Sequence, residues 1–273
     1  MLYTGGAQPV TKAIVIIPTY KEHENIQAII DAVFALPTDF HVLIVDDSSP
    51  DGTAEIVADL QNLYNDGETK LHLIKRPGKQ GLGTAYITGF HYAIQKNYDY
   101  ILEMDADFSH DPKDLVRLYN ACYKDGADLS IGSRYATGVN VVNWPIGRVL
   151  ISYFASSYVR MITSMPIKDT TAGFVCYRRK VLETIPLDKV KFIGYAFQIE
   201  MKFLAWKYGF KLKEIPIIFT DRTRGESKMS AGIFKEAFFG VLYMTISSWF
   251  KKYIPTTVYK ESPKFTEAFQ QRF

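Results

Sequence analysis

The chain has 273 residues, of which 47% are hydrophobic and 22% charged, as in a folded globular protein rather than a disordered one. Its formal net charge of +3 is too small to indicate a nucleic-acid partner. The cysteines, Cys122 and Cys176, lie in no Cys-x-x-Cys or metal-ligand pattern, so we expect both to be reduced and packed, in a reducing compartment.

The first half of the chain alternates between strand and helix patterns. Apolar, β-branched runs bounded by turn residues predict buried strands, and apolar residues at helical spacing predict helices. In chain order, the predicted elements are strand Ala13–Ile17, helix Glu24–Leu36, strand His41–Val45, a helix from Thr53 onward, strand Leu71–Ile74, helix Gly83–Lys96, strand Tyr100–Met104, helix Pro112–Tyr123 and strand Asp128–Gly132. This alternation predicts an α/β fold with a mostly parallel sheet covered on both faces, in which ligands bind at the carboxyl ends of the strands.

After Gly132 the rhythm changes. The predicted elements are helix Arg148–Ser164, strand Ala172–Tyr177, helix Tyr195–Tyr208, strand Lys211–Ile218 and an aromatic-rich helix Ile233–Phe250. The longest uncharged apolar stretch, Ala237–Phe250, would reach about 21 Å as a helix, short of the roughly 30 Å of a membrane's hydrocarbon core. We therefore expect no transmembrane helix, and Met1–Lys12 has no apolar segment that would indicate a signal peptide.

Acidic residues follow three of the predicted strands. The segments are Pro18 to Glu22, Asp46-Asp47 with the turn Ser49 to Gly52, and Asp105-Ala106-Asp107. Because the carboxyl ends of parallel strands meet at one edge, we expect a shared site there. Two carboxylates one residue apart repel each other unless a cation lies between them, and hard divalent cations take such oxygen ligands. Asp105 and Asp107 therefore suit a metal-bound diphosphate, whereas Asp47 and Glu22 suit a nucleoside, and Asp51 or Thr53 fits a helix cap as well as a ligand role.

A polar stripe marks the helix predicted at Arg148–Ser164. Arg148, Ser152, Ser156 and Arg160 recur every fourth residue on an otherwise apolar helix. The stripe is either the water-facing side of the helix, or it presents Arg148 and Ser152 to a phosphate beside a lipid-facing surface. Arg134, just past the fifth strand, would join them, because the fixed fork of arginine donors suits phosphate.

Three further segments each have two interpretations. The glycine-rich Pro77–Ala85 is a plain turn or a ligand contact, and it matches neither a P-loop nor a dinucleotide fingerprint, which excludes a dehydrogenase. The basic Arg222–Lys228 is a solvated loop or one that closes over a diphosphate. The helix Ile233–Phe250 lies in a membrane interface or in the core.

Together these segments resemble the dolichyl/polyprenyl-phosphate mannose synthases, within the inverting GT-A glycosyltransferases of family 2. The matching strings, in family order, are Ile17–Glu22, Val45–Thr53, Gly81–Tyr86, Met104–His110, Gly132–Tyr135, Asp169–Phe174 and Arg222–Lys228. The resemblance implies a GT-A fold, with a Rossmann-like, mostly parallel sheet flanked by helices. It implies a catalytic domain over residues 1–230, then an amphipathic helix and tail over 231–273 that is peripheral on the cytoplasmic face of a membrane.

The resemblance also implies roles for individual residues. Asp105 and Asp107 hold Mg²⁺ or Mn²⁺ on the diphosphate, although Ser109 stands where some members have a further metal ligand. The residues implied for the nucleotide sugar are Pro18, Tyr20, Glu22, Val45, Asp46, Asp47, Ala106, Arg222 and Lys228. Those implied for the lipid phosphate are Arg134, Arg148 and Ser152, and Asp169 would orient the acceptor or the sugar hydroxyls.

The implied activity is inverting transfer of mannose from GDP-mannose to a polyprenyl or dolichyl monophosphate. A rival is transfer from a UDP-sugar, glucose or N-acetylhexosamine, to the same or another acceptor. A rival of a different class is a non-catalytic nucleotide-sugar binding protein, against which the intact Asp105, Asp107 and basic loop argue. Some members carry C-terminal transmembrane helices that this chain lacks, so membrane attachment would come from amphipathic helices or a partner subunit.

Overall fold

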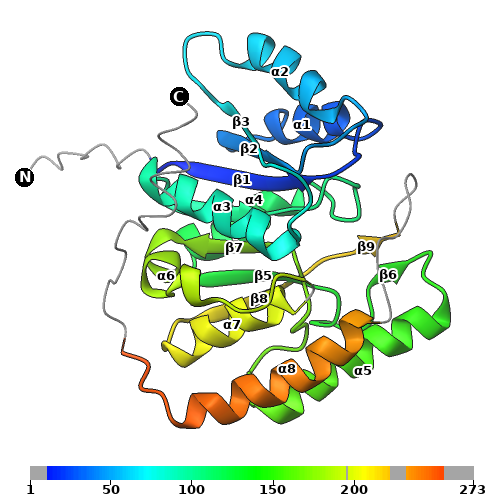
Figure 1. The fold of residues 1–273 in the computed structure, drawn as a ribbon, viewed down its shortest axis with the longest axis vertical. Coiled ribbons are helices and arrows are strands. Elements are labelled where there is room, and N and C mark those ends of the chain that lie inside the picture. The colour runs from blue at the N-terminus through cyan, green and yellow to red at the C-terminus, as the bar shows by residue number, and fades with distance from the viewer. Residues whose placement is uncertain (1–10, 195, 222–231, 255–273) are drawn as a thin grey trace, which may run out of the picture.

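The computed structural model describes residues 11–194, 196–221 and 232–254, built around a seven-stranded sheet (Figure 1). The strand order is β3-β2-β1-β4-β7-β5-β8. The strands are β1 (Ala13–Thr19), β2 (Phe40–Asp46), β3 (Leu71–Lys75), β4 (Tyr100–Glu103), β5 (Leu129–Ser133), β7 (Val175–Arg178) and β8 (Leu212–Pro216). Strand β7 pairs antiparallel with β4 and β5, and the other pairings in this sheet are parallel. The predicted mostly parallel sheet is therefore confirmed.

Helices cover both faces of this sheet and enclose two apolar cores. Helices α1 (Ile26–Phe34), α2 (Thr53–Tyr64) and α4 (Asp114–Tyr123) contribute to one core, and α3 (Leu82–Gln95), α6 (Arg179–Thr184) and α7 (Phe197–Lys207) to the other. A short 3-10 helix, Leu187–Lys189, precedes α7. Strands β1 and β2 are buried on both faces, which is why they read as continuous apolar runs.

The register brings the predicted acidic clusters to one edge. Thr19 at the end of β1 lies opposite Asp46 at the end of β2, and Glu103 at the end of β4 lies opposite Ile16. The N–H of Met104 still donates to Ile16 O at 3.2 Å, after which the chain leaves the sheet into Asp105. The exits of β1, β2 and β4 are thus neighbours, as expected.

The glycine-rich turn before α3 is a packing device. Gly81 has a φ of +99°, which favours glycine, and a Cβ there would lie 2.9 Å from Ile193 O. A Cβ on Gly83 would lie 2.8 Å from the Phe197 ring, and its N–H donates to Ile193 O at 2.8 Å. Close packing against Phe192, Ile193 and Phe197 accounts for these two glycines without a ligand.

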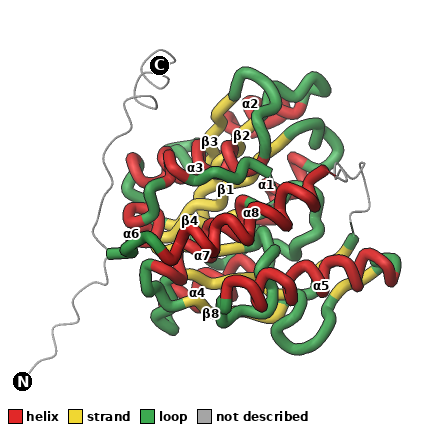
Figure 2. The backbone as a smooth tube through the Cα atoms, turned by 60° about the horizontal axis from the view of Figure 1, so that its bottom comes forward, coloured by secondary structure: helices red, strands yellow, loops and turns green. Residues whose placement is uncertain are grey.

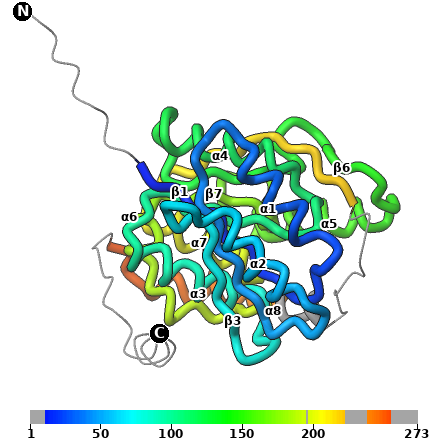
Figure 3. The backbone as a smooth tube through the Cα atoms, turned by 90° about the horizontal axis from the view of Figure 1, so that it is seen from above, coloured from blue at the N-terminus to red at the C-terminus, as the bar shows by residue number. Residues whose placement is uncertain are grey.

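Two long helices lie side by side across the bottom of Figure 1, and Figure 2 brings them forward. They are α5 (Ile146–Thr163) and α8 (Gly232–Trp249). A small sheet of β6 (Val141–Val142) and β9 (Phe219–Thr220) lies beside the start of α5 (Figure 3). In the described parts of the chain, no helix is long and apolar enough to cross a membrane.

Candidate active site

The acidic pair Asp105 and Asp107 leaves β4 in a tight turn. Phe108 has a positive φ of 58°, a rare conformation for a large side chain, and the Ser109 N–H donates to Asp107 Oδ1 at 3.0 Å. Asp107 is buried and Asp105 half-buried. Within the described ranges, no group of three or more His, Cys, Asp or Glu side chains forms a complete metal site. The pair would therefore supply part of a hard cation's oxygen shell and leave the rest to a ligand or water.

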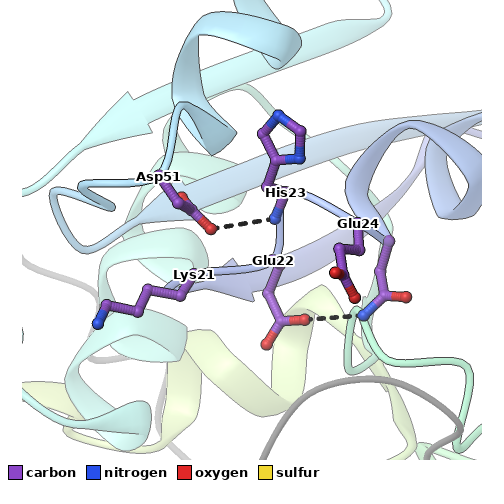
Figure 4. Close-up of a pocket in the computed structure, with 6 residues that line it drawn as sticks. Lys21, Glu22, His23, Glu24 and Asp51 are labelled. Carbon is purple, nitrogen blue, oxygen red and sulfur yellow. Dashed lines mark hydrogen bonds between the residues drawn. The ribbon is translucent and has the colours of Figure 1, made fainter.

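A hollow of about 520 Å³ lies beside the exit of β1 (Figure 4). It is lined by Lys21, Glu22, His23, Glu24, Asn25 and Asp51. Glu22 accepts from the Asn25 side chain at 3.1 Å, whereas Asp51 accepts the His23 N–H at 3.2 Å and the Thr53 hydroxyl at 2.6 Å. The carboxylate of Asp51 thus holds the turn before α2, while the N-cap position of that helix is Gly52, so neither Asp51 nor Thr53 is its capping residue.

Asp46 and Asp47 are adjacent in sequence but differ in role. Asp46 is fully buried and accepts from the Thr19 hydroxyl at 2.8 Å and from the N–H and hydroxyl of Ser49 at 2.9 and 2.6 Å. These bonds occupy its oxygens inside the protein, which argues against the nucleotide contact expected for it. Asp47 instead pairs with buried Arg76, whose Nε donates at 2.6 Å.

Other residues expected at the nucleotide differ in exposure. Pro18 and Tyr20 are half-buried, with the ammonium groups of Lys21 and Lys79 at 5.7 and 5.1 Å from the Tyr20 ring centroid. Val45 and Ala106 are buried, so neither exposes a side chain to a ligand in this structure. The remaining two expected residues, Arg222 and Lys228, lie outside the described residues.

A buried ion pair joins Arg134 to Asp169. The guanidinium donates from Nε and Nη2 to the two carboxylate oxygens at 2.7 and 2.6 Å, and the Arg134 N–H donates to the same carboxylate at 2.9 Å. Burial raises the pKa of Asp169, but the Arg134 guanidinium outweighs that effect and holds the pKa below its ordinary value. With no exposed surface, Asp169 positions Arg134 rather than touching a substrate, which corrects the role expected for it.

Arg134, Arg148 and Ser152 are brought together through two aromatic residues. Trp144 has the Arg148 guanidinium carbon 4.2 Å and the Arg134 guanidinium carbon 5.7 Å from its ring centroid. The Tyr135 hydroxyl donates to Ser152 Oγ at 2.8 Å. Arg148 also pairs with Asp221 at 2.8 Å and keeps its side chain 33% exposed. The polar stripe of α5 therefore faces the protein at Ser152 and Ser156, and the water-facing interpretation is wrong for these residues.

His110 follows the acidic pair by three residues and packs against Phe219, which also contacts Arg134. Its ring stacks on Phe174 at 4.6 Å and meets Phe219 edge-on at 5.3 Å. Burial lowers its pKa to about 4, with Asp107 acting in the opposite direction and Arg134 in the same one. His110 is therefore neutral at pH 7, and both charged groups are close enough to influence it.

A buried network behind the site escaped sequence analysis. Glu103, fully buried at the end of β4, accepts from Gln198 at 2.9 Å, and Lys202 donates to the carbonyls of Ala172 and Gln198 at 2.5 and 2.8 Å. Burial raises the pKa of Glu103 to about 8 and lowers that of Lys202 to about 8. A charged residue inside an otherwise apolar strand was the available signal, because such a residue is costly to bury without a partner.

Residues 14–185 match glycosyl transferase family 2, which is more than half of the chain. The chain belongs to this family. A polyprenol monophosphomannose synthase from Mycolicibacterium smegmatis is 44% identical over 234 residues, which cover 86% of this chain and 87% of that protein. An undecaprenyl-phosphate mannosyltransferase from Micrococcus luteus is 41% identical over 226 residues, covering 83% and 90%. The resemblance to polyprenyl-phosphate mannose synthases is thus confirmed, and the protein is a glycosyltransferase.

Solved structures share the fold at low identity. Glucosyl-3-phosphoglycerate synthase from Mycobacterium tuberculosis, in complex with Mn²⁺, UDP and glucosyl-3-phosphoglycerate, superposes with a TM-score of 0.61 at 15% identity over 87% of this chain and 80% of that one. A mannosyltransferase from Pyrobaculum calidifontis, in complex with GDP-Man and Mn²⁺, superposes with a TM-score of 0.54 at 16% identity. The match covers 95% of this chain and 68% of that one. The expected GT-A fold of this family 2 member is confirmed.

Proposed function

We propose that this glycosyltransferase transfers mannose from GDP-mannose to a polyprenyl monophosphate. One observation carries the proposal: ring contacts link the acidic exit of β4 to the arginine cluster, because His110, three residues after Asp107, meets Phe219 edge-on at 5.3 Å, and the Arg134 guanidinium carbon lies 5.7 Å from the centroid of that Phe219 ring. A donor diphosphate with its cation suits the first and an anionic acceptor suits the second. The names of the two relatives at 44% and 41% identity support this pairing of sugar and acceptor.

The chain's own residues would act by binding and orientation. Asp105 and Asp107 would hold a divalent cation, Mg²⁺ or Mn²⁺, which offsets the charge on the departing GDP. Arg148 and Ser152 would hold the acceptor phosphate, whose oxygen is already ionised near neutral pH and needs no strong base. That oxygen bonds to the anomeric carbon as the bond to the diphosphate breaks, from the opposite face, so the configuration inverts.

Helices α5 and α8 would bring this site to a membrane surface. Both helices expose large apolar side chains: on α5 Ile146, Leu150, Ile151, Tyr153, Phe154 and Met161, and on the described part of α8 Phe238, Phe239, Tyr243, Ile246 and Trp249. An exposed apolar surface of this extent marks an interaction site, and a lipid acceptor requires one beside the arginine cluster. We propose peripheral attachment on the cytoplasmic face, with residues 1–230 as the catalytic domain.

The decisive experiment is turnover with radiolabelled GDP-mannose and polyprenyl phosphate. Asp105→Ala should lower kcat by roughly a thousandfold or more, because a ligand of the charge-stabilising cation is lost. Asp66→Ala, an exposed carboxylate in the α2–β3 turn, is the control and should leave turnover unchanged. Near-normal activity of Asp105→Ala rules out the metal role.

Two comparisons separate the substrates. Arg148→Ala should raise KM for the lipid phosphate more than KM for GDP-mannose, while Arg160→Ala, an exposed arginine of the same helix, should change neither. Equal effects on both substrates would count against the acceptor assignment. Calorimetry with Mn²⁺ and a panel of GDP- and UDP-sugars tests the donor, and preference for a UDP-sugar would replace GDP-mannose in the proposal.

A further inference from the structure

A second hollow lies at the C-terminal end of α8, the end away from β6 and β9 in Figure 1. It has a volume of about 300 Å³ and lies between the segment before α7, α7 itself and the end of α8. Its charged lining residues are Lys189, Lys191, Lys251, Lys252 and Glu200. The excess of cations suits an anion, and none of these residues takes part in the site proposed for mannose transfer.

The single carboxylate in this lining is turned inward. Glu200 is 6% exposed, and its Oε2 accepts the N–H groups of Lys191 at 2.9 Å and Phe192 at 3.0 Å. It therefore holds the wall of the hollow. The four lysines are all exposed, so the surface that a ligand meets is cationic.

Aromatic contacts hold the lysine-bearing segments in place. The Lys191 ammonium lies 4.6 Å from the ring centroid of Tyr243 and 3.3 Å from its hydroxyl. Tyr253, next to Lys252, packs edge-on against Tyr208, the residue after α7, with 5.2 Å between the ring centroids. These contacts place the lysines around the hollow although their own side chains are exposed.

The hollow adjoins the exposed apolar stripe of α8. Phe239, Tyr243, Ile246 and Phe250 are 66%, 57%, 49% and 85% exposed and follow one face of the helix at intervals of four, three and four residues. Tyr243 belongs to this stripe and also lines the hollow. A ligand there would have cations around its polar end and an apolar surface beside it.

We propose that this lysine hollow binds the phosphate head group of an anionic phospholipid, at a site separate from the acceptor phosphate. The proposal rests on the membrane attachment of α5 and α8 proposed above. Lysines near an anionic membrane surface add to the binding supplied by buried apolar side chains. The hollow would fix how α8 lies on the membrane and therefore how the active site meets its lipid acceptor.

The test is sedimentation of the full chain with vesicles of phosphatidylcholine alone and with vesicles containing 30% phosphatidylglycerol, at low ionic strength. Wild type should bind the anionic vesicles at least about tenfold more tightly. The variant K191Q/K251Q/K252Q should lose most of that preference, and K191R/K251R/K252R should keep it. The control K96Q/K113Q/K124Q removes three exposed lysines next to α3 and α4 and should behave as wild type. Transfer to polyprenyl phosphate in detergent should be unchanged in all three variants.

The outcomes separate this site from the proposed function. If the glutamine variant and the control lost the preference for anionic vesicles equally, the proposed lysine hollow would be wrong, because positive charge anywhere on the surface would then explain the binding. Equal binding of wild type to both vesicles would overturn it as well, while leaving membrane attachment through apolar residues intact. Binding to neither vesicle would overturn both, and loss of transfer in detergent by the glutamine variant alone would place these lysines in the reaction instead.

Discussion

Helix α1 buries only apolar side chains, whereas α5 buries polar ones as well. Helix α1 buries Ile26, Ile29, Ile30 and Val33, whereas α5 buries Ser156, Val159 and Thr163. The side chains that α5 leaves exposed include Ile146, at 79%, and Met161, at 74%. Both sequences have helical periodicity, so periodicity identifies the helix but does not say which face points inward. In α5 the serines of the polar stripe point inward, where Ser152 accepts from the Tyr135 hydroxyl and Ser156 lies 3.3 Å from the Thr171 hydroxyl, whereas Arg160 of the same stripe is exposed.

The largest expected effect tests whether the buried polar groups beneath α5 contribute as much to the free energy of unfolding as an apolar core does. Asp169→Asn should lower the free energy of unfolding by about 3–5 kcal/mol, because it leaves the buried Arg134 without its counter-charge. Urea denaturation at pH 7 measures this, where the lowered pKa of Asp169 keeps the wild-type carboxylate ionised. The control Asp188→Asn changes an exposed carboxylate. A loss below about 1 kcal/mol would mean that the pair is not essential to this packing.

The next effect tests the α1 side of the comparison. Ile30→Ala should lower the free energy of unfolding by about 2–4 kcal/mol, because the side chain is fully buried and a cavity would remain. Vesicle binding and KM for either substrate should not change. If Ile30→Ala lowered the free energy of unfolding no more than a substitution at an exposed position, the side chain of Ile30 would not be packed in the apolar core.

The same substitution on α5 should give the opposite result. Ile151 is 56% exposed, so Ile151→Ala should change the free energy of unfolding by less than about 0.5 kcal/mol. Binding to phosphatidylcholine vesicles should fall at least about fivefold, because the lost methyl and methylene groups would be buried in lipid. Unchanged vesicle binding together with a large stability loss would place this face in the protein interior.

The smallest effect concerns polar groups that are partly buried on the opposite face of the sheet, beneath α3. The ring nitrogens of His72, in β3, form hydrogen bonds with the hydroxyl groups of Tyr98 at 3.0 Å and Tyr92 at 2.8 Å. Burial lowers the pKa of His72 to about 4. As the pH drops, His72 is protonated at a higher pH in the unfolded chain than in the folded protein. The free energy of unfolding should therefore fall between about pH 6.5 and pH 4.

The variant His72→Gln should make that fall shallower, by on the order of 1 kcal/mol after screening by solvent. Denaturation between pH 4 and 7 measures it, and transfer at neutral pH should not change. If the variant's stability depended on pH as steeply as that of wild type, other groups would cause the dependence. One such group is His41, whose ring contacts that of His72 and whose pKa is also lowered by burial.

The amino-acid sequence by itself determined the fold class and the edge at which the site lies. Apolar runs of strand length recur between helical patterns, and parallel strands leave their carboxyl ends at one edge, so the exits of β2 and β4 lie at the same edge, on either side of β1. It also grouped Arg134, Arg148 and Ser152 as candidates for the acceptor phosphate; the two arginines contact Trp144 and Ser152 contacts Tyr135, while their binding role stays a prediction.

Only the tertiary structure decided which polar residues are occupied inside the protein. Asp46 and Asp169 look like site residues in a motif, but hydrogen bonds from Thr19, Ser49 and Arg134 take up their oxygens. Glu103 is bonded to Gln198, and Asp47 to Arg76. Both partners lie far away in the sequence, so only the packing of the folded chain identifies them. Periodicity is a local property, whereas the direction in which a helix face points depends on what the rest of the chain places beneath it.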